Sequence, residues 1–62
     1  MKRADVVTRD GDVYEACAVE THGVRTMGRK PRTIVWADIA RIRYWRTTRG
    51  AWGVPPMQGR AA

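Results

Sequence analysis

The sequence predicts a small all-β domain, and three observations support this prediction. The 62 residues include no Leu and no Phe, and their apolar side chains are mainly Val, Ile, Ala and Trp. Val, Ile and Trp favour strands, whereas a helix in a small domain usually needs Leu for its buried stripe. An Asp-Gly pair lies between two β-branched runs, which predicts a tight hairpin, and residues 40–46 alternate with the two-residue period of a strand.

The first two strands are predicted at residues 4–9 and 13–20. A β-branched run ends at Asp10-Gly11-Asp12, where the Gly can adopt the positive φ that a tight turn requires. The second strand carries the small residues Ala16-Cys17-Ala18 at its centre, which allow a sharp bend over a small core. We therefore expect an antiparallel hairpin that bends in its second strand.

Two short strands, a helical turn and a final strand are predicted next. The short strands, at residues 24–28 and 32–36, follow the turn Thr21-His22-Gly23 and flank a polar loop. Ala37-Asp38-Ile39 predicts one tight helical turn. Residues 40–46 then form the fifth strand, with Arg side chains along one of its faces.

The fifth strand has a helical alternative. If Asp38 caps a helix over residues 39–46, then Trp36, Ile39 and Ile42 lie on one side of that helix. The alternation described above favours the strand, and the sequence alone leaves both interpretations open.

Two segments carry a resemblance to a known architecture. Residues 7–15, Val-Thr-Arg-Asp-Gly-Asp-Val-Tyr-Glu, are similar to the opening hairpin of Sm-like proteins, and residues 33–42, Thr-Ile-Val-Trp-Ala-Asp-Ile-Ala-Arg-Ile, are similar to the closing strands of such barrels. Over residues 4–46 the chain thus resembles a five-stranded SH3-like or Sm-like small β-barrel. Sm proteins carry a Gly in the bent second strand, where this chain has Ala16-Cys17-Ala18. The resemblance implies a barrel and a tendency to assemble into rings, and it leaves the ligand open.

The composition changes after Thr48. Residues 49–62 contain Trp52 and the pair Pro55-Pro56 and show no periodicity, which predicts an extended tail. We therefore expect a small β-barrel domain at residues 1–48 and an extended C-terminal tail at residues 49–62.

The charge is strongly positive and unevenly distributed. The formal net charge is +6, with three basic against five acidic residues up to Gly23 and nine basic against one acidic residue beyond it. Ten of the twelve basic residues are Arg, whose guanidinium binds phosphate and stacks on bases, although a GC-rich genome produces the same preference. The charge therefore indicates an acidic partner, of which nucleic acid is the commonest.

Three basic segments form the predicted nucleic-acid site. On the fifth strand, alternation places Arg and Trp side chains on one face, where guanidinium groups can bind phosphates and an indole can stack on a base. The loop at residues 28–32 resembles an AT-hook type of minor-groove arm, and residues 46–50 extend the basic strip. A solvated strand face, a charged loop and a flexible linker are the alternative interpretations of the three segments. The predicted nucleic-acid-binding residues are Arg29, Lys30, Arg32, Arg41, Arg43, Trp45, Arg46 and Arg49.

The sequence predicts neither an enzyme nor a cofactor. Its single His and single Cys supply neither a metal-binding set nor a nucleophile with an adjacent base. Cys17 lies among small apolar residues, so we expect a buried thiol, and His22 lies in a predicted turn. No apolar run approaches the roughly 18 residues of a membrane span. We expect a cytoplasmic protein without a membrane partner or a small-molecule substrate, located in a virion or the host cytosol if a phage encodes it.

Two classes of function follow from these observations. The first is a non-enzymatic module that binds RNA or DNA and forms a homo-oligomer, since a core this small rarely supplies more than about 3–5 kcal/mol by itself. The second is a structural or interaction protein of a larger assembly, such as a small virion component or a phage or mobile-element protein that docks on a host protein. In that function the tail is the contact arm, with Trp52 as the anchor and Pro55 and Pro56 reducing the entropy lost on ordering.

Overall fold

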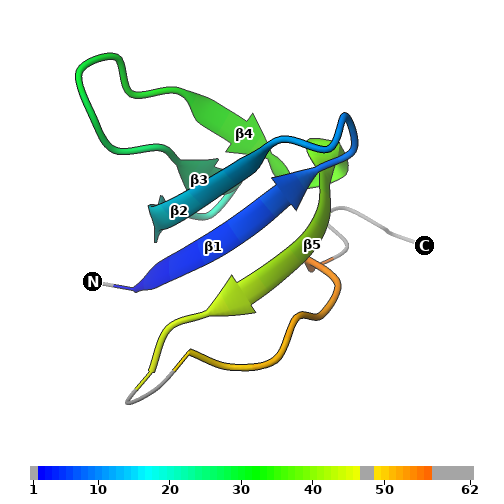
Figure 1. Cartoon of the computed structure of the whole chain (residues 1–62). Helices are drawn as coiled ribbons and strands as arrows, with labels where there is room; N and C mark the ends of the chain where they lie inside the picture. Colours follow the sequence, from blue (N-terminus) through cyan, green and yellow to red (C-terminus); the bar gives the residue numbers. More distant parts are fainter. Residues whose placement is uncertain (1, 47–48, 57–62) are drawn as a thin grey trace.

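The computed structural model describes residues 2–46 and 49–56 and contains one antiparallel five-stranded sheet (Figure 1). The strand order is β4-β3-β2-β1-β5, and a 3-10 turn, η1, connects β4 to β5. The predictions of an all-β fold with five strands and one helical turn before the last strand are therefore confirmed. The elements are β1 (Arg3–Thr8), β2 (Val13–Val19), β3 (Gly23–Arg25), β4 (Thr33–Val35), η1 (Trp36–Asp38) and β5 (Ile39–Tyr44).

Apolar side chains from all five strands and from η1 meet in one core. The half-buried rings of Tyr14 and Tyr44 and the side chain of Val19 pack against its margin. Because the largest fully buried side chains are only Ile and Val, each strand contributes little apolar area, and the core depends on contacts among all of them. The core residues are Ala4, Val6, Cys17, Val24, Ile34, Trp36, Ile39 and Ile42.

The hairpin of β1 and β2 contains the predicted tight turn and a β-bulge. Gly11 has a φ of +94° in the turn, where its amide donates to the carbonyl of Thr8 at 2.9 Å. Further along β2, the register shifts opposite Asp5, and Ala16 has a φ of +57°. A bulge of this kind bends a strand and increases its twist. In β2 it lies at the start of the small residues Ala16-Cys17-Ala18, where the sequence predicts a bend.

The strands β3 and β4 are shorter than predicted. The amide of Thr26 still donates to the carbonyl of Arg32 at 2.8 Å, but the amide of Arg32 donates to the Thr26 hydroxyl, at 2.9 Å, in place of a backbone carbonyl. A side chain thus replaces one bond of the ladder and ends the pairing. The two strands approach closely at Gly23, where an added Cβ would collide with the carbonyl oxygen of Ile34.

The last strand is β5, and the alternative of a helix over residues 39–46 is wrong. From Ile39 to Tyr44 the chain pairs antiparallel with β1, and beyond it the amide of Trp45 donates to the carbonyl of Arg3 at 2.9 Å. The strand forms in place of the helix because it buries the apolar side of β5 against the core. Its backbone also completes the hydrogen bonds of β1. The 3-10 turn begins one residue earlier than predicted, at Trp36, whose indole N–H donates to the carbonyl of Thr21 at 2.9 Å.

Residues 49–53 run back along the outer edge of β5. Gly53 exchanges two backbone hydrogen bonds with Ile42, at 2.8 and 2.9 Å, and the amide of Gly50 donates to the carbonyl of Tyr44 at 3.0 Å. In Figure 1 this returning segment is drawn in orange beside β5. β5 therefore has hydrogen-bonded neighbours on both sides, whereas among the described residues β4 pairs with β3 alone.

The described strands form an open sheet, because pairing between β4 and β5 does not occur in residues 2–46 and 49–56. In the same residues there is no helix with the length and apolar character needed to cross a membrane.

Candidate nucleic-acid interface

The antiparallel register of β1 and β5 places the start of one strand beside the end of the other. Ala4 lies opposite Tyr44, so the two residues that precede Ala4 meet the two that follow Tyr44. Together they line a pocket of about 400 Å³, which we term the sheet-end pocket. Its lining residues are Lys2, Arg3, Tyr44, Trp45 and Arg46.

The sheet-end pocket is lined by three basic and two aromatic residues, and no Asp or Glu of residues 2–46 and 49–56 lines it. The Arg3 guanidinium is held in place, because its Nη1 donates to the carbonyl of Ala16 at 3.0 Å. Lys2 and Arg46 are exposed. Cations of this kind bind phosphate, and Tyr and Trp rings offer flat surfaces for a base.

A fully buried carboxylate, that of Asp5, lies directly behind Trp45. Its Oδ1 accepts hydrogen bonds from the Trp45 indole N–H at 2.8 Å and from the Ala16 amide at 3.0 Å. Its Oδ2 accepts two from Arg43, at 2.8 and 3.1 Å, and lies 3.6 Å from Nε of Arg49. The carboxylate is thus surrounded by donors from β2, β5 and the returning segment.

Two cation–π pairs extend this arrangement. The guanidinium carbon of Arg43 lies 4.5 Å from the centroid of the Trp52 ring, and that of Arg49 lies 4.3 Å from the centroid of Trp45. Each Arg therefore contacts both the buried carboxylate and an indole. We term this group the Asp5 cluster; its members are Asp5, Arg43, Trp45, Arg49 and Trp52.

The electrostatics of the Asp5 cluster favour the charged carboxylate. Burial raises the pKa of Asp5, whereas hydrogen bonds from the Ala16 amide and from Arg43 lower it. The hydrogen bond from Trp45 and the charge of Arg49 act in the same direction, and the net pKa lies below its usual value. Two guanidinium groups around one carboxylate leave a net positive charge on the cluster, and the Arg49 side chain is 47% exposed.

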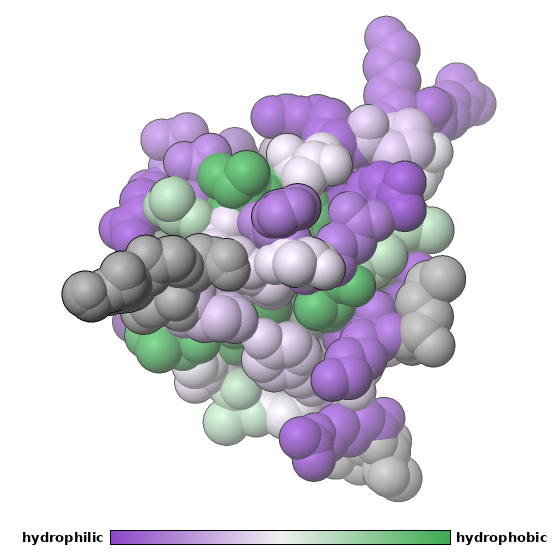
Figure 2. All heavy atoms as spheres, turned by 180° about the vertical axis from the view of Figure 1, so that it is seen from behind, coloured by the Kyte–Doolittle hydropathy of each residue, from purple (hydrophilic) through white to green (hydrophobic). Residues whose placement is uncertain are grey.

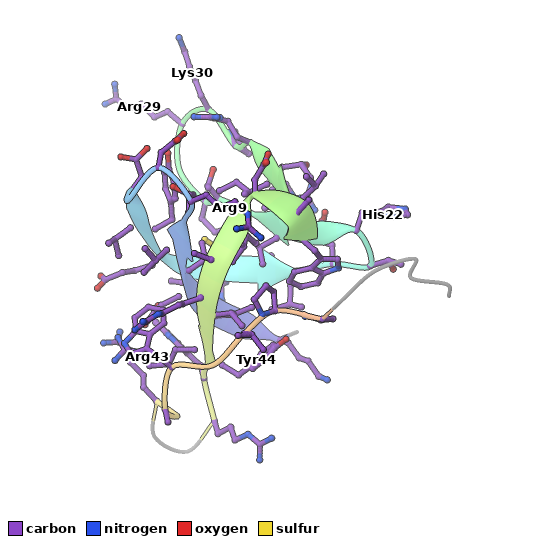
Figure 3. The ribbon with its side chains drawn as sticks, turned by 90° about the vertical axis from the view of Figure 1, so that its right-hand side faces the viewer. Arg9, His22, Arg29, Lys30, Arg43 and Tyr44 are labelled. Atoms are coloured by element: carbon purple, nitrogen blue, oxygen red, sulfur yellow. The ribbon has the colours of Figure 1, made fainter. Side chains whose placement is uncertain are left out.

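The predicted basic residues fall into two separate regions. Figure 3 shows Arg29 and Lys30 projecting from the loop between β3 and β4, at the opposite end of the molecule from Arg43 and Tyr44. In Figure 2, hydrophilic atoms likewise project at the upper right, from this loop, and at the lower right, near the end of β5. The eight predicted binding residues thus do not form one strip.

The remaining predicted binding residues differ in their surroundings. Arg46 lines the sheet-end pocket, and Arg41 is exposed on β5. Arg43 is half-buried, because its guanidinium is bound to Asp5. Arg32 lies at the edge of a different pocket, of about 380 Å³, which carboxylates also line.

The predicted tail residues contact the chain's own sheet. Trp52 lies against Arg43, and its side chain is 37% exposed. Pro55 and Pro56 line a shallow pocket of about 330 Å³ together with Trp36 and Ile39. In this arrangement the described part of the tail lies against β5 and η1.

Sequence reasoning missed Lys2, Arg3, Tyr44 and Asp5. The first three enter the sheet-end pocket through the pairing of the first strand with the last, which no local pattern specifies. The sequence carries no clear signal for Asp5, because a carboxylate in a strand can also face solvent on the side opposite its apolar neighbours.

Cys17 and His22 are the two remaining residues that the sequence analysis considered for chemistry. Cys17 is fully buried, as expected, and burial together with the nearby charge of Asp5 raises the pKa of its thiol. His22 is exposed and points away from the sheet-end pocket (Figure 3). Within residues 2–46 and 49–56, His, Cys, Asp and Glu side chains form no group of three or more that could hold a metal ion.

Comparisons of the chain with protein-family models, with curated proteins and with solved structures find no match.

Proposed function

We propose that this protein binds nucleic acid, RNA or DNA, without catalysis, and that the sheet-end pocket is the main contact. The observation that carries the proposal is the lining of that pocket, which within the described residues consists of three basic and two aromatic residues and includes no Asp or Glu. Phosphate groups bind Lys2 and Arg46, which are exposed, and the aromatic rings contact a base.

The Asp5 cluster fixes the position of Trp45, one of the residues that line the sheet-end pocket. It fixes the indole of Trp45 by a hydrogen bond and a cation–π pair, so little conformational entropy is lost when a ligand contacts this ring. The exposed part of Arg49 supplies a further positive charge beside the pocket. Arg43 has a positioning role in the proposal, because its guanidinium is already bound to Asp5.

We propose a second, weaker contact at the loop between β3 and β4. Arg29 and Lys30 project into solvent there, and their distance from the sheet-end pocket means that only a long nucleic acid reaches both regions (Figure 3). Contacts of this kind with phosphates are screened by salt, and they add affinity without sequence preference.

We also propose that the fold is an SH3-like or Sm-like small barrel. Support comes from the strand order β4-β3-β2-β1-β5 and from η1, which joins the two strands at the ends of that order.

The alternative function is a structural or interaction protein of an assembly. Trp52 and Gly53, in the proposed contact arm, already contact β5, so this function requires the arm to leave its own sheet. Release of the arm from residue 49 onward breaks three backbone hydrogen bonds, two cation–π pairs and the ion pair of Arg49 with Asp5.

Fluorescence anisotropy with a labelled oligonucleotide of about eight nucleotides tests the proposed function. We expect the double variant Lys2→Ala/Arg46→Ala to bind at least about tenfold more weakly than the unchanged protein, since both exposed phosphate-binding side chains are removed. The matched control is Arg29→Ala/Lys30→Ala, which removes the same charge at the opposite end of the molecule and should change binding less than about twofold.

Equal weakening by the two double variants would show that only the total charge matters and would contradict the proposed site. Failure of the unchanged protein to bind at low salt, together with a closed oligomer by light scattering, would instead favour the assembly function.

A further inference from the structure

We propose that the sheet-end pocket accepts an unstacked base, so that the protein binds single-stranded nucleic acid in preference to a duplex. This inference rests on the proposed function and names its substrate class. It follows from the form of the pocket, from the fixed position of Trp45 and from the placement of the cations.

Two aromatic residues line the pocket. Tyr44 is the last residue of β5 and Trp45 follows it, so their side chains leave opposite faces of the sheet, and both residues line the pocket at the end of that strand. In a duplex the flat faces of the bases are covered by neighbouring bases, and only their edges are accessible in the grooves. Aromatic side chains in a pocket can therefore stack only on a base that has left the helix.

The indole of Trp45 is fixed before a ligand arrives. Its N–H donates to the buried Asp5 carboxylate at 2.8 Å, and the Arg49 guanidinium covers one face of the ring at 4.3 Å. A base can therefore stack on at most one face of this ring. One base at Trp45, rather than two, is therefore the expected stoichiometry of stacking.

The cations around the pocket suit the flexible sugar-phosphate backbone of a single strand. Lys2, Arg3 and Arg46 lie at the ends of two adjacent strands and line the same pocket as the aromatic residues, so they can bind the phosphates that flank an inserted base. A duplex has the higher charge density and would bind more tightly if charge alone determined affinity. A preference for single strands thus requires contacts to the bases.

The test compares one labelled strand of about 12 nucleotides, of non-self-complementary sequence, with the same strand annealed to its complement. Anisotropy titrations at equal salt should show at least about tenfold tighter binding of the single strand. The variant Tyr44→Leu, which removes the ring and keeps an apolar side chain, should weaken single-strand binding at least about fivefold and leave duplex binding unchanged.

Tyr44→Phe is the matched control, because it keeps the ring and removes only the hydroxyl; its single-strand affinity should stay within about twofold of the unchanged protein. Low reactivity of the buried Cys17 towards a thiol reagent verifies that both variants are folded. If Tyr44→Leu does not fold, the comparison of single strand and duplex with the unchanged protein still decides the inference.

Equal or tighter binding of the duplex overturns the inference. If Lys2→Ala/Arg46→Ala then weakens binding of the duplex, the proposed function still holds. Equal single-strand affinity of folded Tyr44→Leu and the unchanged protein overturns the stacking contact. Absence of binding to both nucleic acids at low salt contradicts the proposed function itself.

Discussion

Asp5 determines how the basic and aromatic side chains around β5 are arranged. Its carboxylate is fully buried and binds Arg43, Trp45 and the amide of Ala16. Removing one partner of a buried ion pair typically costs about 3–5 kcal/mol, because the other charge loses its compensation. Ala16 adopts a positive φ beside this carboxylate, and the hydrogen bond from its amide to Asp5 supports a backbone conformation that is unusual for a residue with a Cβ. The fold and the proposed binding surface therefore depend on the same side chain.

The first prediction concerns the pH dependence of stability. The pKa of Asp5 is lower in the folded protein than in the unfolded chain, where it is about 3.8. The corresponding stabilisation is fully present above that value and is lost as the pH falls through the folded pKa. We therefore expect the free energy of unfolding, measured with denaturant from pH 7 to pH 2, to decrease in acid.

The variant Asp5→Asn should be less stable by about 3 kcal/mol at neutral pH and should have a shallower acid dependence. Asp12→Asn, the same change at an exposed turn position, is the control and should behave like the unchanged protein. An unaltered acid dependence in folded Asp5→Asn would show that Asp5 does not stabilise the fold by its charge. If Asp5→Asn does not fold, Arg49→Ala removes one partner only and should produce a smaller loss.

At the level of elements, the returning segment at residues 49–53 protects the edge of β5. An uncovered edge strand presents unpaired amides and carbonyls that can bind another chain. Gly53 supplies both a donor and an acceptor to Ile42, and Trp52 adds the contact with Arg43. The segment thus occupies the side of β5 that a neighbouring copy would otherwise pair with.

The variant Gly53→Pro tests this protection. Proline removes the amide that donates to the carbonyl of Ile42, so we expect release of the segment, a change in Trp fluorescence and concentration-dependent self-association. Light scattering over a range of concentrations measures the association.

Ala51→Pro is the control for this variant, because within the described chain the Ala51 amide has no backbone hydrogen bond to β5. Unchanged mass of Gly53→Pro at all concentrations, with an altered Trp signal, would show that an open β5 edge does not drive association.

At the level of the whole molecule, the basic groups are divided between two ends. The Cα atoms extend over 34 Å in the longest direction, and the loop with Arg29 and Lys30 lies at the opposite end from Tyr44 (Figure 3). On the face shown in Figure 2, hydrophobic atoms occur as separate spots among hydrophilic ones, and they form no broad patch. This face therefore suits a hydrated, charged ligand better than an extensive apolar interface.

The division of charge predicts a dependence on ligand length. With a strand of about four nucleotides, Arg29→Ala/Lys30→Ala should leave the affinity unchanged, whereas with about 16 nucleotides it should weaken binding. The slope of log affinity against log salt concentration should become shallower by about 0.7 for each phosphate that the variant no longer neutralises. An equal effect of the variant on short and long strands would contradict two separated contacts.

The sequence by itself determined the local structure of this protein. The Asp-Gly turn, the alternation along residues 40–46 and the helical turn before them depend on near neighbours in the chain, so each is visible as a short pattern. The predicted ends of the strands are less accurate where a side chain replaces a backbone hydrogen bond between strands, as the Thr26 hydroxyl does next to Arg32. The total positive charge was equally evident before the fold was known.

Only the tertiary structure decided which of those charges act together. Alternation places Arg43 and Trp45 on one face of β5, but it contains no information about Asp5, which lies 38 and 40 residues earlier in the chain. In the same way, Lys2 and Arg3 reach Tyr44 only because β1 pairs with β5. Contacts between distant residues depend on strand order and register, which arise when the whole core packs, and local sequence patterns do not encode them.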